Sequence, residues 1–349
     1  MATPIYEFAQ LPGVARRATS QRVHKRDRQP GEEPRVGVIY NPRSHRNQGA
    51  DFDCEVCPHV HIAKPGNRSA LPDALAGFAQ AGIDLLVING GDGTVRDVLT
   101  CGEAIFGEDW PVLAVLPKGK TNALTVDLGI PSDWNLQDAI DAFDTGVRVR
   151  RRPMKVRDLT KDGQSTVLGF ILGAGAFTHS IKAGQSAHKL GAFNSAVVAV
   201  TGLWGLVQAL FATRANPWRR GSRMQIKLGT QRTPMVHSGS GDPDFRQILF
   251  ATTLEQLPAK LQPFGRLRTG LRLVAVDQVD RRTTAILPLV AMGQIQSNLR
   301  ERGIHPLSLP EFTLEIEDPF IFDGEAFPAG EYWIGQGPAL DFVTPPAAT

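Results

Sequence analysis

The stretch LLVINGGDGTVRDVLT, residues 85–100, places a glycine-rich turn directly after a run of apolar residues. Glycine lets the backbone approach a phosphate closely, and the start of a following helix offers N–H groups to it. Asp92 lies among these glycines, where the phosphates of a nucleotide would pass. A carboxylate is repulsive there unless it holds a metal, accepts a proton or binds hydroxyl groups. The stretch therefore predicts a nucleotide site with Mg²⁺; a tight turn with Asp92 as a helix cap stays the alternative.

Strand and helix signals alternate on both sides of this stretch. Apolar runs predict strands at 35–40, 59–63, 83–90 and 111–117, and the segments 70–82 and 133–143 predict helices, the second capped by Ser132 or Asp133. Strands that alternate with helices form a parallel sheet covered on both faces. Ligands bind such sheets at the carboxyl ends of the strands, where the glycine-rich turns lie.

The pattern changes after the basic run 148–152. Six strand-like segments follow, mostly separated by turn signals, at 154–159, 165–175, 223–229, 247–254, 270–276 and 312–324. They predict a largely antiparallel second domain. The expected fold class is α/β: a disordered basic arm (1–33), a three-layer α/β/α nucleotide-binding domain (34–150), a β-rich, sandwich-like lipid-substrate domain (151–343) and a tail (344–349). The return of the last strand to the first domain is left open.

Residues 190–213 form a long segment without a charged side chain. Three interpretations stay open: a membrane span, a helix packed in the core, and a helix that covers an apolar ligand site. The flanking basic residues would suit a membrane surface; they are Lys189, Arg214, Arg219 and Arg220.

Charge and cysteine content limit the other classes of function. A formal net charge of +3 over 349 residues is too small to indicate a nucleic-acid partner. The basic residues near the start are not followed by an apolar run, so they do not resemble a secretory signal. They allow a weak attraction to anionic lipid. Three cysteines indicate a reducing compartment. The zinc-type cluster at Cys54, Cys57, His59 and His61 is too crowded for the usual finger spacing.

A second phosphate-loop pattern, AVLPKGKT at 114–121, competes with the first. It fits poorly, because Ala114 and Val115 belong to a strand and Pro117 removes a backbone donor. Lys118 and Lys120 can still bring positive charge to a nucleotide.

Four motifs in sequence order make the chain similar to the diacylglycerol kinase catalytic family. They are YNPRS (40–44), GGDGT (90–94), LPKGKTNALTVDLGIP (116–131) and FDGE (322–325). That family includes sphingosine, ceramide and bacterial lipid kinases and is distantly similar to NAD kinases. GGDGT alone would be shared with NAD kinases, whereas FDGE at this distance resembles the lipid-kinase branch. The resemblance runs from about residue 35 to residue 342.

The resemblance implies ATP, with Mg²⁺, in a cleft between the two domains. The implied nucleotide-binding residues lie in three turns: Asn41, Arg43 and Ser44; Gly90, Gly91, Asp92, Gly93 and Thr94; and Gly119, Thr121 and Asn122. Asp323 and Glu325 resemble the carboxylates of the family's Asp-Gly-Glu, whose glutamate is the proposed general base in bacterial members. We expect Glu325 to accept the proton of the acceptor hydroxyl, with Asp92 as the alternative base. A surface β-hairpin is the other interpretation of this segment.

The chain departs from the family pattern at four places. His45 follows Ser44 where glycine is usual, and Arg96-Asp97 replaces Asn-Glu after GGDGT. Lys120 displaces the third-turn threonine to Thr121. Thr269 and Arg272 stand where relatives carry the carboxylates of a metal-linked network. The metal ligands are therefore not predicted, and a weak or inactive kinase stays an alternative.

The sequence thus predicts an ATP-dependent lipid kinase of the diacylglycerol kinase type. It would phosphorylate a primary hydroxyl of a membrane lipid such as diacylglycerol, ceramide or a sphingoid base. The expected protein is cytoplasmic, contacts the inner membrane face peripherally and binds no nucleic acid, and a homodimer is left open. The alternatives are a soluble-substrate kinase of the NAD-kinase type and a non-catalytic nucleotide-binding regulator. All of this requires that the turns around Asp92 and Glu325 converge on one cleft.

Overall fold

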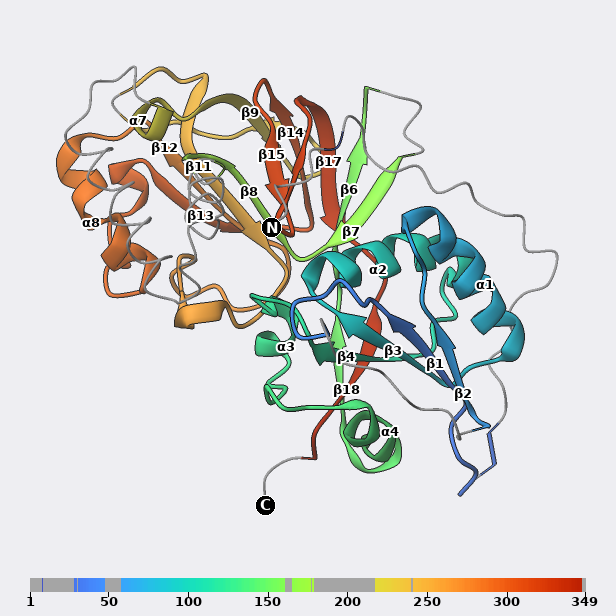
Figure 1. Ribbon diagram of the computed structural model, residues 1–349. Coiled ribbons are helices and arrows are strands. Elements are labelled where there is room, and N and C mark those ends of the chain that lie inside the picture. Colours follow the sequence, from blue (N-terminus) through green and yellow to red (C-terminus); the bar gives the residue numbers. More distant parts are fainter. Residues whose placement is uncertain are drawn as a thin grey trace.

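The computed structural model describes residues 8, 28–29, 31–47, 58–160, 165–176, 178, 217–239 and 241–346. Two sheets, each the centre of one domain, organise these residues (Figure 1). This arrangement confirms the expected fold class, an α/β domain joined to a β-rich domain.

The first sheet contains six strands of the described chain, in the order β2-β1-β3-β4-β18-β5. Their bounds are β1 Val36–Tyr40, β2 Val60–Ala63, β3 Leu85–Gly90, β4 Val112–Pro117, β5 Val147–Arg151 and β18 Leu340–Thr344. All neighbours are parallel except β18 and β5. β1 and β3 are buried at every position, as a parallel sheet covered on both faces requires.

Helices cover both faces of this sheet (Figure 1). α1 (Leu71–Ala81) and α2 (Asp92–Phe106) pack together on one face, α4 (Leu136–Thr145) lies on the other, and the short α3 (Ala123–Asp127) follows β4. A 3-10 turn at Arg68–Ala70 precedes α1, which ends at Gly82 with a φ of 61°. These are the three layers expected from the alternating pattern.

The start of α4 differs from the expectation. Asn135 caps the helix by accepting the N–H groups of Gln137 and Asp138, and the Asp138 carboxylate accepts the Asn135 N–H in return. The expected cap at Ser132 or Asp133 is wrong, because this reciprocal capping box satisfies more helix N–H groups than a cap two or three residues earlier.

The second sheet contains twelve strands of the described chain, and all their pairings are antiparallel. The first six are β6 Met154–Asp158, β7 Thr166–Gly169, β8 Ile171–Gly175, β9 Ser222–Leu228, β10 Thr233–Pro234 and β11 Phe245–Thr252. The others are β12 Arg272–Asp277, β13 Ile304–Ser308, β14 Glu311–Ile316, β15 Phe320–Phe322, β16 Glu325–Phe327 and β17 Gly330–Gln336. The main path runs β16-β15-β8-β11-β9-β14-β17-β6-β7, with β12 and β13 continuing from β11.

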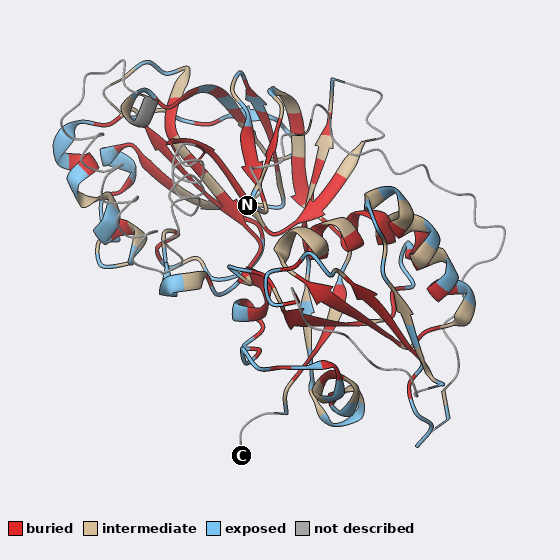
Figure 2. Ribbon diagram, in the orientation of Figure 1, coloured by how far each residue is buried: buried red, intermediate tan, exposed pale blue. Residues whose placement is uncertain are grey.

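Helices and turns of the second domain lie outside this sheet. They are α7 (Pro217–Arg220), α8 (Arg281–Ala291) and the 3-10 turns Pro258–Lys260 and Arg300–Arg302. Figure 2 shows the buried residues concentrated in the strands of both sheets, with exposed residues on α4 and α8. No helix among the described residues is long and apolar enough to span a membrane, and residues 190–213 lie outside that part of the chain.

Within the described ranges from residue 31 onward, two connections between the domains lie side by side. The first joins β5 to β6 and the second joins β17 to β18, which lies between β4 and β5 in the first sheet. Arg152 donates to the Gly337 carbonyl at 3.0 Å, and the Gly337 N–H donates to the Pro153 carbonyl at 2.7 Å. The two domains are therefore joined by two hydrogen-bonded connections.

α2 also packs against the second domain. The Leu168 N–H on β7 donates to Thr100 Oγ1 at 3.0 Å, and Lys155 Nζ on β6 lies 2.8 Å from Glu103 Oε1. The helix that starts at the glycine-rich turn thus lies between the two sheets.

Asp127, at the end of α3, holds a further contact between the domains. Its side chain is fully buried, and it accepts hydrogen bonds from Arg151 Nε at 2.7 Å and from the Gln256 N–H at 2.6 Å. Arg151 also reaches Glu255 Oε2 at 3.1 Å. A carboxylate of the first domain is therefore anchored to the backbone of the second.

Removing this carboxylate should weaken the whole protein. Asp127→Ala leaves the Arg151 guanidinium and the Gln256 N–H without their buried acceptor, and we expect the free energy of unfolding to fall by about 3 kcal/mol. Denaturant unfolding monitored by circular dichroism measures this value. The matched control is Asp341→Ala, which removes the exposed partner of the neighbouring Arg150 and should leave unfolding nearly unchanged. Equal effects of the two substitutions would contradict the assignment.

Candidate active site

Three turns at the carboxyl ends of β1, β3 and β4 meet at one edge of the first sheet. Asn41, after β1, donates from Nδ2 to Thr94 Oγ1 at 2.8 Å. The Arg46 N–H donates to the Lys118 carbonyl at 3.1 Å and so joins the first turn to the third. The three turns predicted to bind a nucleotide therefore form one continuous surface.

The second and third turns touch backbone to backbone at two glycines. A Cβ atom added to Gly119 would lie 2.7 Å from the Gly91 Cα, and one added to Gly91 would lie 2.9 Å from the Gly119 Cα. Neither distance is compatible with a side chain, so both positions require glycine. The GGDGT and LPKGKT motifs thus depend on each other sterically.

The Asp92 carboxylate is the first side chain of α2, and it faces α3 rather than its own helix. Its Oδ1 accepts the Ala123 N–H at 2.9 Å. Burial raises the pKa of Asp92, and the N–H groups at the start of α3 oppose that rise. Asp92 therefore links the second turn to the third through a hydrogen bond.

Asn122 closes the third turn from within. It has a φ of 51°, its Oδ1 accepts the Gly119 N–H at 2.7 Å, and its Nδ2 donates to the Gly119 carbonyl at 3.1 Å. Thr121 and Lys120 are exposed on the same turn, and Lys118 is half-buried. The turn therefore presents cations and a hydroxyl around a rigid backbone.

The first turn is held by an asparagine that the sequence analysis did not single out. Asn47 is buried, and its Nδ2 donates to the Asn41 carbonyl and to Asn89 Oδ1, both at 2.9 Å. Ser44 is buried in the same turn, whereas Arg43 is exposed. No periodic pattern marks Asn47, because its partners come from the end of a different strand.

The FDGE motif is the tip of the hairpin formed by β15 and β16. Asp323 and Gly324 form its two-residue turn, with φ values of 43° and 80°. The Asp323 carboxylate accepts the N–H groups of Phe170 at 3.0 Å and Ile171 at 2.8 Å. A Cβ at Gly169 would lie 2.2 Å from Asp323 Oδ2, so this approach also requires glycine. Asp323 therefore fixes the hairpin to the junction of β7 and β8.

Glu325 lies between two arginines. Its Oε1 is 3.5 Å from Arg68 Nη2 and 3.6 Å from Arg96 Nη2, and Arg96 is almost fully buried. Asp97 contacts both arginines, at 2.5 Å from Arg68 Nε and 2.9 Å from Arg96 Nη2. Burial raises the pKa of Glu325, and the positive charges of Arg96 and Arg68 oppose that rise. Glu325 Oε2 is buried and has no hydrogen-bond partner among the described residues.

The nucleotide turns and the hairpin face one another. A Cβ at Gly93 would lie 3.9 Å from Glu325 Oε1 and 3.8 Å from Arg96 Nη2. Asp92 is also close enough to Asp323 that its negative charge contributes to raising the Asp323 pKa. The two motifs, far apart in the sequence, therefore meet at one site.

Arg68 and Arg96 are the site residues whose role the sequence analysis missed. Arg96 was noted only as a departure from the family pattern, yet it lies three residues after Gly93 in α2. Residues three apart share a helix face, so this spacing was a usable signal. Arg68 lies before α1 and had no such signal.

Thr269 and Arg272 stand where relatives carry carboxylates, and neither side chain can replace a carboxylate as a metal ligand. Arg272 is buried, its guanidinium lies 4.9 Å from the centre of the Phe264 ring, and burial lowers its pKa. Thr269 is exposed. No group of three or more His, Cys, Asp or Glu side chains in the described ranges could hold a metal ion. Cys54 and Cys57 lie outside those ranges.

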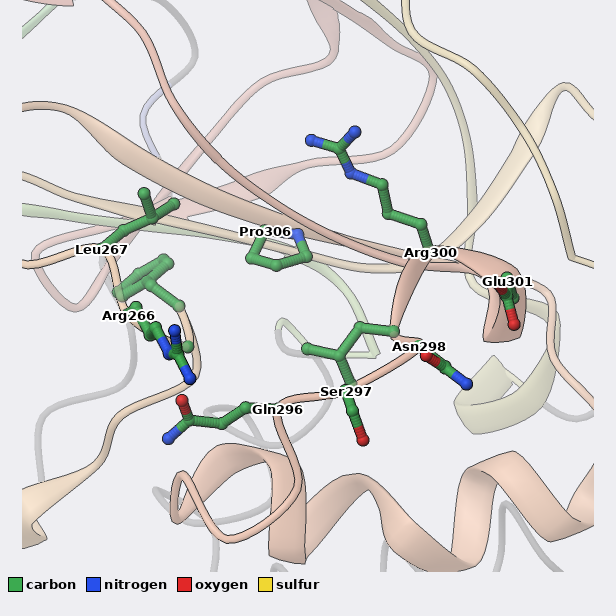
Figure 3. A pocket seen from close by; sticks show the side chains of 11 residues that line it. Arg266, Leu267, Gln296, Ser297, Asn298, Arg300, Glu301 and Pro306 are labelled. Atoms are coloured by element: carbon green, nitrogen blue, oxygen red, sulfur yellow. The ribbon is translucent and has the colours of Figure 1, made fainter.

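A cavity of about 620 Å³ lies elsewhere, in the second domain (Figure 3). Its apolar lining includes Phe264, Leu267, Leu299 and Pro306, and its polar lining includes Arg266, Gln296, Asn298 and Arg300. It contains no residue of the three turns or of the hairpin. It is therefore separate from the candidate active site.

Residues 35–156 match the family model of the diacylglycerol kinase catalytic domain. This segment is similar to the diacylglycerol kinase catalytic domain. The family resemblance expected from the four motifs is thus confirmed. The match covers the three turns and both arginines of the candidate active site, whereas Asp323 and Glu325 lie beyond it.

Two crystal structures from Bacillus anthracis str. Sterne share the fold of this chain. One is described as a diacylglycerol kinase (TM-score 0.61, 16% identity) and the other as a candidate diacylglycerol kinase (TM-score 0.62, 17% identity). Each comparison covers 90% of this chain and 99% of the other. No curated protein sequence matches the chain. At such low identity the structures establish the common fold of both domains.

A side chain at Gly119 should separate the second and third turns. We expect Gly119→Ala to lower the free energy of unfolding by about 1–3 kcal/mol, the usual cost of overpacking, and to weaken binding of an ATP analogue measured by calorimetry. Gly77→Ala is the matched control, because Gly77 is exposed on α1 with no atom within 4 Å of an added Cβ. The control should match or slightly exceed wild-type stability. If Gly119→Ala keeps the stability and the nucleotide affinity of the wild type, the close approach of Gly91 and Gly119 is refuted.

The Asp323 carboxyl should make stability depend on pH. Burial raises its pKa to about 7, so between about pH 4 and pH 7 the folded protein keeps a proton that the unfolded chain has lost. The contribution of Asp323 to the free energy of unfolding therefore falls as the pH rises through that range. Asp323→Asn cannot ionise but still offers an oxygen to the Ile171 N–H.

Melting temperatures of wild type and Asp323→Asn, measured from pH 4 to pH 7.5, check this expectation. The melting temperature of Asp323→Asn, relative to that of the wild type, should rise steadily as the pH rises. The exposed Asp133→Asn serves as the control and should follow the wild type. A constant difference across the range would show that Asp323 keeps an ordinary pKa.

Proposed function

We propose that the protein is an ATP-dependent lipid kinase that transfers the γ-phosphate to a primary hydroxyl of a membrane lipid, such as diacylglycerol, ceramide or a sphingoid base. The observation that carries the proposal is the position of Glu325. Its carboxylate faces Gly93 in the nucleotide turn, within 4 Å of two guanidinium groups. The kinase domain supports phosphoryl transfer as the reaction class.

The three turns suit a triphosphate. The N-terminus of α2 directs N–H groups and a partial positive charge toward the turn that precedes it. Arg43, Lys118 and Lys120 lie on the neighbouring turns and add positive charge. Together these groups would neutralise and orient the phosphates, which is most of what phosphoryl transfer requires.

Asp92 fits a magnesium ion that arrives with the nucleotide. Mg²⁺ usually takes one or two carboxylates together with phosphate oxygens and water, so a dedicated cage of three carboxylates is not needed. Asp92 lies where the second and third turns touch. When bound, the ion would supply charge neutralisation at the β- and γ-phosphates.

Glu325 would act as the general base on the acceptor side. Burial raises its pKa, which strengthens the carboxylate as a base, and the positive charges of the two arginines oppose that rise. Arg96 lies between Glu325 and the nucleotide turn, where it would stabilise negative charge on the transferred phosphoryl group. Asp323 would position the hairpin that carries the base.

A lipid acceptor also requires contact with a membrane surface. We include in the proposal a reversible association with the inner membrane face, to which the basic residues before residue 30 would contribute. The family of the kinase domain supports the lipid class.

Labelled ATP and a set of acceptors separate the possible functions. Purified full-length protein with γ-labelled MgATP would receive mixed micelles of diacylglycerol, ceramide or sphingosine, and separately NAD. We expect label in one of the lipids. Label in NAD would replace the proposal by a soluble-substrate kinase, and ATP binding without label transfer would replace it by a regulator.

The same assay tests the base. Glu325→Gln should reduce turnover by about 10²–10⁴-fold, the contribution of a general base, while the dissociation constant for ATP stays within about twofold of wild type. Glu315→Gln is the matched control, because it removes the same charge from an exposed position on β14. Full turnover in Glu325→Gln would exclude Glu325 as the base.

A further inference from the structure

Phe8 precedes the first strand and belongs to neither sheet, yet it packs next to the segment that carries the candidate base. Its N–H donates to the Ala326 carbonyl at 2.9 Å. Its ring stacks on Phe327, with the centroids 4.7 Å apart and the planes 10° apart. Ala326 and Phe327 directly follow Glu325 in β16, which ends the main path of the second sheet. An edge strand offers backbone groups to an added segment, and Phe8 uses one of them.

The Phe8 ring also covers both arginines of the candidate active site. Its centroid lies 4.4 Å from the Arg68 guanidinium carbon and 5.5 Å from that of Arg96. Guanidinium groups at these distances are attracted to the face of an aromatic ring. The two guanidinium groups that approach Glu325 Oε1 thus also contact the ring of Phe8.

With Phe8 in this place, one carboxylate oxygen of Glu325 is buried and the other faces two arginines, while 22% of the side chain stays exposed. Oε1 faces the two arginines, and Oε2 is buried without a hydrogen-bond partner in the part of the chain that the structure describes. A general base must come within about 2.6–3.2 Å of the hydroxyl that it deprotonates. Some group near Glu325 must therefore move before an alcohol can reach the buried Oε2.

Phe8 is the group that can leave with the least effect on the fold. Arg96 is part of α2 and donates to the Phe322 carbonyl, and Arg68 precedes α1 and pairs with Asp97. Phe327 lies in the core of the second domain. Phe8 comes from outside both sheets and packs on that core from its partly buried position.

We propose that Phe8 is a built-in occupant of the acceptor side of the site, which the lipid displaces when it binds. The ring takes the place of the hydrocarbon next to the reacting hydroxyl, stacked on Phe327 and over Arg68 and Arg96. In this state the protein is autoinhibited, because Oε2 of the base is buried and Phe8 covers the two arginines beside it. The inference rests on the proposed lipid-kinase function and adds the regulation of that site.

Kinetics with short-chain acceptors test the displacement. We expect Phe8→Ala to lower the KM for dioctanoylglycerol, or for octanoyl ceramide, by about tenfold, since an aromatic contact of this kind is worth roughly that factor. The KM for ATP should not change. Trp333→Ala, which truncates a half-buried aromatic side chain on β17 that contacts Arg157, is the matched control and should keep the wild-type KM. An unchanged or higher acceptor KM in Phe8→Ala would overturn the inference and leave the kinase function intact.

A spectroscopic readout keeps the inference testable without turnover. Full-length protein with 4-trifluoromethylphenylalanine in place of Phe8 would give one fluorine resonance, to be compared with a peptide of residues 1–15 that carries the same probe. We expect the protein resonance to differ from the peptide resonance and to move toward it when either short-chain lipid is added without ATP. A resonance equal to that of the peptide from the start, or one that neither lipid moves, would overturn the inference.

The two readouts separate the two possible failures. If no lipid is phosphorylated, the proposed function fails, and the fluorine resonance alone decides whether a lipid displaces Phe8. If a lipid is phosphorylated while the resonance stays at its docked position, the autoinhibitory contact is refuted and the lipid kinase stands.

Discussion

The backbone contact between Gly91 and Gly119 determines where the polar groups of the candidate active site can lie. Because no side chain fits between these residues, the turns after β3 and β4 approach closely enough for Asp92 to accept the Ala123 N–H. The first turn joins them through Asn41 and Thr94. A phosphate-binding surface needs many backbone N–H groups in one place, and this close approach is what assembles them.

α2 transmits that arrangement to the second domain. It begins at the glycine-rich turn, carries Arg96 and Asp97 in its first two turns, and packs on β7 through Thr100. Arg96 in turn contacts Glu325 and donates to the Phe322 carbonyl. A single rigid helix therefore sets the distance between the nucleotide turns and the hairpin that carries the candidate base. The same arginine also lies over the ring of Phe8, so Phe8 contacts the group of charges that surrounds Glu325.

The two carboxylates of the FDGE motif illustrate what sequence patterns can and cannot separate. Both are acidic residues at the tip of one hairpin, and the motif predicts both as site residues. Asp323 accepts two backbone N–H groups from the junction of β7 and β8, whereas Glu325 has one oxygen without such a partner. The difference comes from strands that are distant in the sequence. The segment does form a hairpin, and the hairpin lies beside the glycine-rich turn, so the two interpretations of this motif are compatible.

The sequence by itself determined the elements and their class. Buried strands, glycine turns and amphipathic helices are local patterns, so the parallel sheet, its three layers and the β-rich second domain could be predicted from residues 35–344. The common location of the three turns could be predicted as well, because each follows a strand whose carboxyl end must lie at one edge of the sheet. Only the tertiary structure decided that Arg68, Arg96, Glu325 and Phe8 share one site. Their contacts depend on packing between segments from both domains and the start of the chain, and no local periodicity encodes such distances.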